Sequence, residues 1–145
     1  MGKIRTFLRL PLARKLMLAE ALILSGYYRF KMLCTPFPAL AKGMGMPEKE
    51  SPWEENCGAK ARQVGWAVGA VCRRTPWQSQ CLVQALTARK MLQRRGISCT
   101  MYMGARRNDQ GQAEAHAWLR SGKTFVVGGD GSRSYAITSV YCTER

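Results

Sequence analysis

The sequence predicts an α+β fold in which three helices precede a small antiparallel sheet. Through the first two thirds of the chain, apolar residues recur at steps of three and four, as expected of amphipathic helices. After Gly96 the period changes to two, as expected of strands. The 145 residues suffice for one ordinary core with an appendage. Helices followed by strands, rather than alternating with them, indicate an α+β domain.

The first predicted element is a long, basic, amphipathic helix over residues 12–33. Its apolar face consists of Leu12, Leu16, Ala19, Ile23, Tyr27 and Phe30. Such a helix can cap its own chain, dock on a partner or lie on a membrane, and we expect the first two before the third. The prolines and glycines of residues 36–53 indicate a linker. We therefore divide the chain into an N-terminal helical region (1–45), a linker (46–58) and a core (59–145).

Two further helices follow the linker. The first covers about residues 59–74 and ends before Pro76, because the residue before a proline disfavours helical backbone. Ser79 can cap the next helix, and Gly96 terminates it. Its expected buried side consists of Leu82, Ala85, Leu86 and Met91 or Leu92. Cys81 then falls in the first turn of this helix.

The strands are predicted over residues 98–105, 113–119, 123–129 and 134–142, with tight turns between them. We expect them to pair as an antiparallel meander. Alternation along the second strand places Glu114, His116 and Trp118 on one face of the sheet. His116 is the single histidine of the sequence.

Charge and cysteine content restrict the function classes. The net charge of +14 favours an anionic partner, such as nucleic acid, a membrane surface or an acidic peptide. The six cysteines lack the spacing of a zinc site, and most lie in apolar patterns typical of reduced thiols in a cytosolic protein. No apolar run has the ~18 to 20 residues that a membrane-spanning helix needs. We expect a cytoplasmic protein without a metal or another cofactor.

Three residues form a candidate catalytic constellation. The N-terminus of a helix lowers the pKa of a thiol, which favours Cys81 as a nucleophile. His116 is the one available imidazole base, and Asp130, just past the next strand, is better placed to orient it than Asp109. The alternatives are a core thiol at Cys81, an ordinary sheet residue at His116 and a turn former at Asp130. The occurrence of all three in this order favours a Cys-His-Asp triad.

The segments "TPWQSQCLVQALTARKMLQRRGI", "MYMGARR" and "AEAHAWL" resemble the transglutaminase-like, papain-type cysteine peptidases of lasso-peptide biosynthesis. These enzymes remove the leader from the precursor peptide. The resemblance covers residues 76–130 and implies a papain/transglutaminase-like core. It assigns the nucleophile to Cys81, the base to His116 and the acid to Asp130.

The resemblance also implies partners. The chain has no room for a leader-binding domain, so a separate leader-recognition protein is expected, and a lasso cyclase would take the freed core peptide. Backbone N–H groups, with Gln78 or Gln80, would hold the oxyanion. Trp77, Trp118, Arg94 and Arg95 are candidates for docking substrate or partner.

Three other functions stay open at this point. The same triad serves transglutaminase-type acyl transfer to an amine. A basic nucleic-acid-binding protein explains the charge, although the sequence lacks a recognisable nucleic-acid-binding motif. A non-catalytic scaffold in a biosynthetic assembly would use the N-terminal helix as its contact.

Overall fold

The computed structural model describes residues 2–53, 58–75, 81–129 and 132–144. Its helices are α1 (Gly2–Arg9), α2 (Leu12–Cys34), α3 (Phe37–Ala41), α4 (Gly58–Cys72) and α5 (Cys81–Arg94). Its strands are β1 (Met46–Pro47), β2 (Cys99–Arg107), β3 (Ala113–Ser121), β4 (Thr124–Val127) and β5 (Ala136–Thr143). The α+β prediction is confirmed. Helices α1 and α3 and strand β1 were not predicted.

The described strands form one antiparallel sheet with the order β1-β5-β2-β3-β4. The predicted meander is confirmed for β2, β3 and β4, which pair in chain order, and is wrong for β5, which does not pair with β4. Strand β5 returns past the β2–β3 hairpin and pairs with β2, which is the strand order of a Greek key. Strand pairing over this distance is decided by tertiary packing, which a local pattern does not encode.

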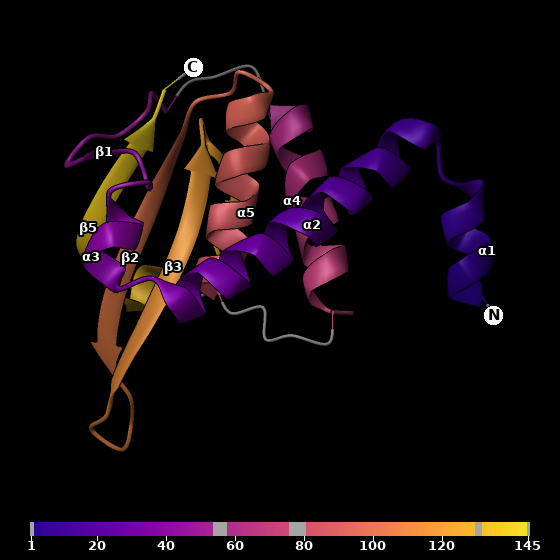
Figure 1. The fold of residues 1–145 in the computed structure, drawn as a ribbon. Coiled ribbons are helices and arrows are strands. Elements are labelled where there is room, and N and C mark those ends of the chain that lie inside the picture. Colours follow the sequence, from indigo (N-terminus) through magenta and orange to yellow (C-terminus); the bar gives the residue numbers. More distant parts are fainter. Residues whose placement is uncertain (1, 54–57, 76–80, 130–131, 145) are drawn as a thin grey trace.

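Helices α4 and α5 cover one face of the sheet, and α2 crosses over both (Figure 1). The core lies between these layers. Its largest fully buried apolar side chains include Leu86, Met91 and Leu92 of α5, Met101 of β2 and Leu119 of β3. Helix α5 ends at Arg94, and two residues later the positive φ of Gly96, 69°, lets Ile97 N–H donate to the carbonyl of Leu92.

Helix α2 packs on α4 and α5 with a different side from the one that the sequence predicted. Its buried residues are Ala21, Ser25 and Tyr28, and Met17, Leu18, Leu24 and Met32 pack beside them. The large members of the predicted face, Leu12, Leu16, Ile23, Tyr27 and Phe30, are between 51% and 71% exposed. The helix is apolar on two opposite sides. The side with Ala21 and Ser25 packs on α4 and α5, because these two small residues allow a close approach.

The described part of the predicted linker, residues 46–53, packs on the sheet. Strand β1 pairs with β5, and Glu48 N–H donates to the carbonyl of Val140. Ser51 is buried and bonds Thr100 Oγ1 through both its backbone N–H and its hydroxyl. The division of the chain at this segment stays a prediction. Among the described residues, no helix is long and apolar enough to cross a bilayer.

Candidate active site

Cys81 is the first residue of α5, as the sequence predicted, and its side chain is half-buried against the core. Helix α5 packs on β3, the strand that carries His116 (Figure 1). The N–H groups in the first turn of a helix have no partner four residues earlier in that helix. The start of α5 therefore places a thiol beside backbone donors that suit an oxyanion.

The imidazole of His116 is held by two aromatic rings and one carbonyl. Its ring centroid lies 5.5 Å from that of Trp118 and 5.0 Å from that of Tyr135. Nε2 lies 2.8 Å from the carbonyl oxygen of Gly128. Trp118 and His116 share a face, as the alternation along the strand predicted.

The Gly128 carbonyl requires a proton on Nε2 of His116 in this arrangement. A carbonyl oxygen only accepts hydrogen bonds, so Nε2 carries the proton and Nδ1 of the neutral imidazole is the acceptor. Glycine is needed here: φ is 72°, and a Cβ would lie 2.6 Å from the Ala117 carbonyl oxygen. The residue type at position 128 thus allows the backbone to approach the imidazole and leaves Nδ1 for a thiol.

The thiol and the imidazole lie on different sides of β3. Ala117 and Leu119 share a core cluster with α5 residues, whereas His116 stacks with Trp118 on the alternate face. Within the described ranges no hydrogen bond joins Cys81 to His116. The described pairing of β4 with β3 begins at Leu119, so the edge of β3 beside His116 is not covered by that strand. The direct pairing of Cys81 with His116 stays a prediction.

Four of the predicted site residues, Asp130, Gln78, Gln80 and Trp77, lie outside the described residues. Their assigned roles stay predictions. The chain leading to position 130 passes beside the base, because the carbonyl that accepts from Nε2 belongs to Gly128, two residues earlier.

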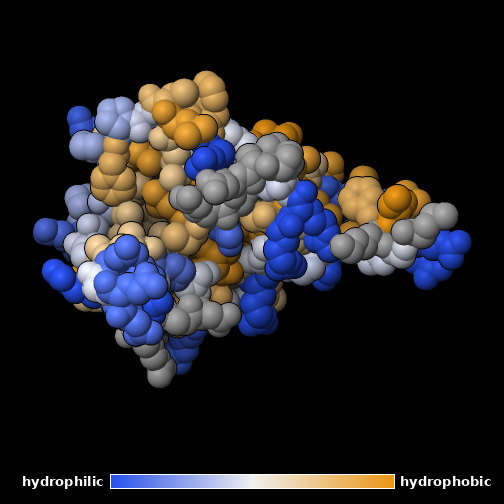
Figure 2. All heavy atoms as spheres, turned by 90° about the horizontal axis from the view of Figure 1, so that it is seen from below, coloured by the Kyte–Doolittle hydropathy of each residue, from blue (hydrophilic) through white to orange (hydrophobic). Residues whose placement is uncertain are grey.

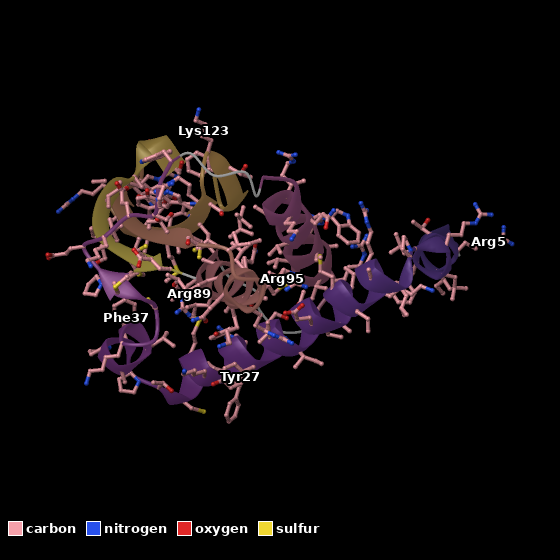
Figure 3. The ribbon with its side chains drawn as sticks, turned by 90° about the horizontal axis from the view of Figure 1, so that it is seen from above. Arg5, Tyr27, Phe37, Arg89, Arg95 and Lys123 are labelled. Atoms are coloured by element: carbon pink, nitrogen blue, oxygen red, sulfur yellow. The ribbon has the colours of Figure 1, made fainter. Side chains whose placement is uncertain are left out.

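The docking roles predicted for Trp118, Arg94 and Arg95 stay predictions: all three contact other residues of the chain, and the Arg94 side chain is 59% exposed. Trp118 is only 4% exposed and stacks between His116 and Tyr102. Arg94 and Arg95 both pair with Glu20 of α2, at 3.0 and 2.7 Å. These arginines fasten α2 to α5, and Figure 3 shows Arg95 between the two helices.

Sequence reasoning missed a buried cation on the face of His116. Arg120 is fully buried and lies over the ring of Trp53, 3.7 Å from its centroid. It donates to the hydroxyl groups of Tyr102 and Thr100 and to the carbonyls of Ser51, Pro52 and Gly122. Alternation was the available signal, since position 120 follows 116 and 118 on the same face of the strand.

Tyr102 connects this cation to the aromatic stack. Its hydroxyl donates to Glu50 and accepts from Arg120, and its ring stacks on Trp118 at 5.6 Å. Burial is the main cause that raises the pKa of Tyr102 to about 12, and the hydrogen bond to Glu50 adds to it. Tyr135, which also escaped sequence analysis, closes the other side of the imidazole. The base is thus held in a chain of packed rings.

The structure thus combines a half-buried cysteine at a helix start, a helix packed on an antiparallel sheet and an imidazole anchored on that sheet. The family model described as the transglutaminase-like superfamily matches residues 27–140. The chain belongs to the transglutaminase-like superfamily. The match begins inside α2 and ends inside β5. No curated protein and no solved structure gave a match.

Proposed function

We propose that the chain is a cysteine peptidase that removes the leader from a ribosomally made lasso-peptide precursor, with Cys81 as nucleophile and His116 as base. The observation that carries the proposal is the anchored imidazole. The one histidine of the chain, His116, lies on β3 and donates through Nε2 to the carbonyl of Gly128. Strand β3 contacts α5, the helix that begins at Cys81. Membership of the transglutaminase-like superfamily supports thiol chemistry of this general kind.

In the first chemical step the Cys81 thiolate attacks the scissile carbonyl and forms a C–S bond. Backbone N–H groups of the first turn of α5, with Gln78 or Gln80, hold the oxyanion. When the tetrahedral intermediate collapses, the peptide C–N bond breaks and protonated His116 gives its proton to the leaving amine. In the second step water attacks the thioester, His116 takes its proton, and the thiol is regenerated.

These steps require Nδ1 of His116 to meet the thiol. The imidazole would have to turn from the Trp118 face of β3 toward the α5 side, past the Gly128 backbone, which lies against Ala117 and Trp118. During the turn Nε2 exchanges the Gly128 carbonyl for an orienting partner, for which we propose the carboxylate of Asp130. Binding of the peptide at the start of α5 would favour the paired state, since it excludes water from the thiol.

The choice of substrate rests on the resemblance carried by residues 76–130. The proposed partners are the precursor peptide, a separate leader-recognition protein and a lasso cyclase that receives the freed core peptide. Neither a specific nucleic acid nor a cofactor enters the proposed reaction.

Leader release tests the proposal directly. The full chain is incubated with a precursor peptide and its recognition protein, and the freed leader is quantified by mass spectrometry. We expect no release by Cys81→Ala, a loss of at least about 100-fold for His116→Ala, and a smaller loss for Asp130→Asn. Cys34→Ala is the matched control, because Cys34 is exposed at the far end of α2. Cleavage by Cys81→Ala at the wild-type rate would overturn the proposal.

Thiol reactivity tests the catalytic pair without a substrate. Cys34 is exposed and Cys81 is half-buried, so accessibility alone makes Cys34 the faster target of iodoacetamide. An activated Cys81 would react faster at neutral pH, and the advantage would vanish in His116→Ala. Faster labelling of Cys34 in the wild type, or an advantage of Cys81 that survives His116→Ala, would contradict the pairing.

The superfamily description also favours a second candidate, transfer of the acyl group to an amine. The first step is then the same, and a primary amine replaces water in the second. Adding a primary amine to the cleavage assay separates the two: an amide product in place of the free acid would indicate an acyl transferase.

A further inference from the structure

A stripe of apolar side chains runs along the outer side of α2. It consists of Leu12, Leu16, Ile23, Tyr27 and Phe30, which repeat at helical spacing on the side opposite to Ala21, Ser25 and Tyr28. Figure 3 shows Tyr27 pointing away from the body of the molecule. A regular stripe over a helix of 23 residues, left without a covering layer, marks an interaction surface.

Helix α1 adds further apolar residues beside α2, and two of them, Ile4 and Phe7, line a groove with Leu18 and Leu22 of α2. Its apolar residues Ile4, Phe7 and Leu8 are exposed, and its sequence alternates them with arginines. Figure 2 shows hydrophobic and strongly hydrophilic side chains adjacent to one another on the arm formed by α1 and the start of α2. An apolar side with basic neighbours is the pattern of helices that lie in the plane of a membrane interface.

The charges beside the stripe are cationic. Lys15 Nζ lies 5.6 Å from the ring centre of Phe7, and Lys31 Nζ lies 5.7 Å from that of Tyr27. The single acidic residue of α1 and α2 is Glu20, and it is neutralised by Arg94 and Arg95. Cations beside exposed rings suit a surface that is apolar inside and anionic at its boundary.

A groove next to the stripe has the same character. Its volume is about 1010 Å³, and its apolar lining includes Phe7, Leu18, Leu22 and Trp66. Lys15, Arg73 and Arg74 also line it. An apolar groove with cations suits an acyl chain that ends in an anionic headgroup.

We propose that the outer side of α1 and α2 docks on the surface of a bilayer containing anionic phospholipid. Charge complementarity selects this occupant over a second copy, because two copies of a chain with a net charge of +14 would bring the same cations together. This proposal differs from the expectation drawn from the sequence, in which contact with the core of the chain or with a partner protein came before contact with a membrane. The surface lies on α1 and α2, away from the sheet that carries His116.

Vesicle sedimentation tests the docking. The full chain is spun with vesicles of phosphatidylcholine containing about one third phosphatidylglycerol, and with vesicles of phosphatidylcholine alone. We expect binding to the first to be at least about tenfold tighter, and to weaken as salt is raised to about 0.5 M. Equal binding to both vesicles, or none to either, would overturn the proposal.

A pair of matched variants locates the surface. Ile23→Glu with Phe30→Glu changes two exposed residues of the stripe, and Phe125→Glu with Ile137→Glu changes two exposed residues of the sheet. The first variant should lose at least about tenfold in vesicle affinity, while the second binds as the wild type does. Circular dichroism checks that both are folded. Unchanged binding by the stripe variant would overturn the proposal.

A protein occupant gives a different result. If the wild type ignores anionic vesicles but elutes as a dimer that the stripe variant converts to a monomer, a second copy covers the stripe and the lipid proposal is wrong.

Discussion

The two faces of the sheet are built from alternate residues of the same strands, yet they are covered in different ways. One face carries Met101, Ala117 and Leu119 and packs under α4 and α5. The other carries Tyr102, His116, Trp118 and Arg120, which are joined by stacking and hydrogen bonds. The first face stabilises the fold by hydrophobic burial, which does not depend on the orientation of the side chains. The second face is held by hydrogen bonds, which require each polar group to point at its partner.

This difference explains where the base can be held. An imidazole in the middle of the helix-facing layer, away from Cys81 and from the proposed Asp130 partner, would be buried among aliphatic side chains at a high cost in desolvation. On the second face it finds rings and the Gly128 carbonyl. The comparison predicts that substitutions on both faces lower stability, but that only those on the second face change the pH dependence of stability or the NMR signal of His116.

The largest loss of stability is expected for Arg120→Met. The change leaves Tyr102, Thr100 and three backbone carbonyls without their donor in a buried place. The free energy of unfolding should fall by about 3 to 5 kcal/mol, measured by urea denaturation. Lys123→Met, at an exposed position near the next turn, is the control and should change it by less than about 0.5 kcal/mol. A loss below about 1 kcal/mol for Arg120→Met would show that Arg120 does not stabilise the second face of the sheet.

Leu119→Ala tests the helix-facing layer. Leu119 is fully buried between the sheet and the helices, so its truncation should cost about 2 to 4 kcal/mol through lost burial and the cavity left behind. Ile137→Ala, on an exposed part of β5, should cost far less in the same urea titration. The His116 ring contacts lie on the other face, so the histidine NMR signal should stay where it is in the wild type. Movement of that signal would mean that the faces are coupled.

The sequence was sufficient for the alternation that separates these faces and for the helix that begins at Cys81, because both depend on local periodicity. It could not choose between the two apolar sides of α2. Leu12, Leu16 and Ile23 have better spacing, but Ala21 and Ser25 are small enough for close packing on α4 and α5. The pairing of β5 with β2 and the burial of Arg120 depend on contacts made by distant segments, including residues 50–53.

Tyr102→Phe tests the second face of the sheet through the pH dependence of stability. At neutral pH the variant loses the hydrogen bonds to Glu50 and Arg120, and about 1 to 3 kcal/mol of stability with them. Folding raises the pKa of Tyr102 from its ordinary value of 10 to about 12, so the folded state favours the neutral phenol. That contribution is complete below pH 10 and is lost as the pH rises toward 12.

The pH comparison is a difference between two proteins. Between about pH 9 and about pH 11 the wild type should lose about 1 kcal/mol more than Tyr102→Phe, because other groups titrate equally in both. Urea titrations at these two values measure it. Parallel losses would show that the hydroxyl of Tyr102 is not held in its neutral form by the fold.

The smallest change in stability and the most local change in the site are expected for Tyr135→Leu. Tyr135 is half-buried, and its ring stacks on His116 at 5.0 Å and lies under Arg106. Its loss should cost about 1 kcal/mol. Because the chain has one histidine, the Cε1–H proton of its imidazole gives one NMR signal, which reports the stack. Tyr135→Leu removes one ring and should shift that signal, whereas Tyr135→Phe keeps the ring and should leave it nearly unchanged.

If the proposed turn of the imidazole toward α5 is correct, Tyr135→Leu also loosens the state bound to Gly128, and labelling of Cys81 by iodoacetamide should become faster relative to Cys34. A shifted signal with unchanged labelling would mean that Tyr135 packs on the base without governing its approach to the thiol.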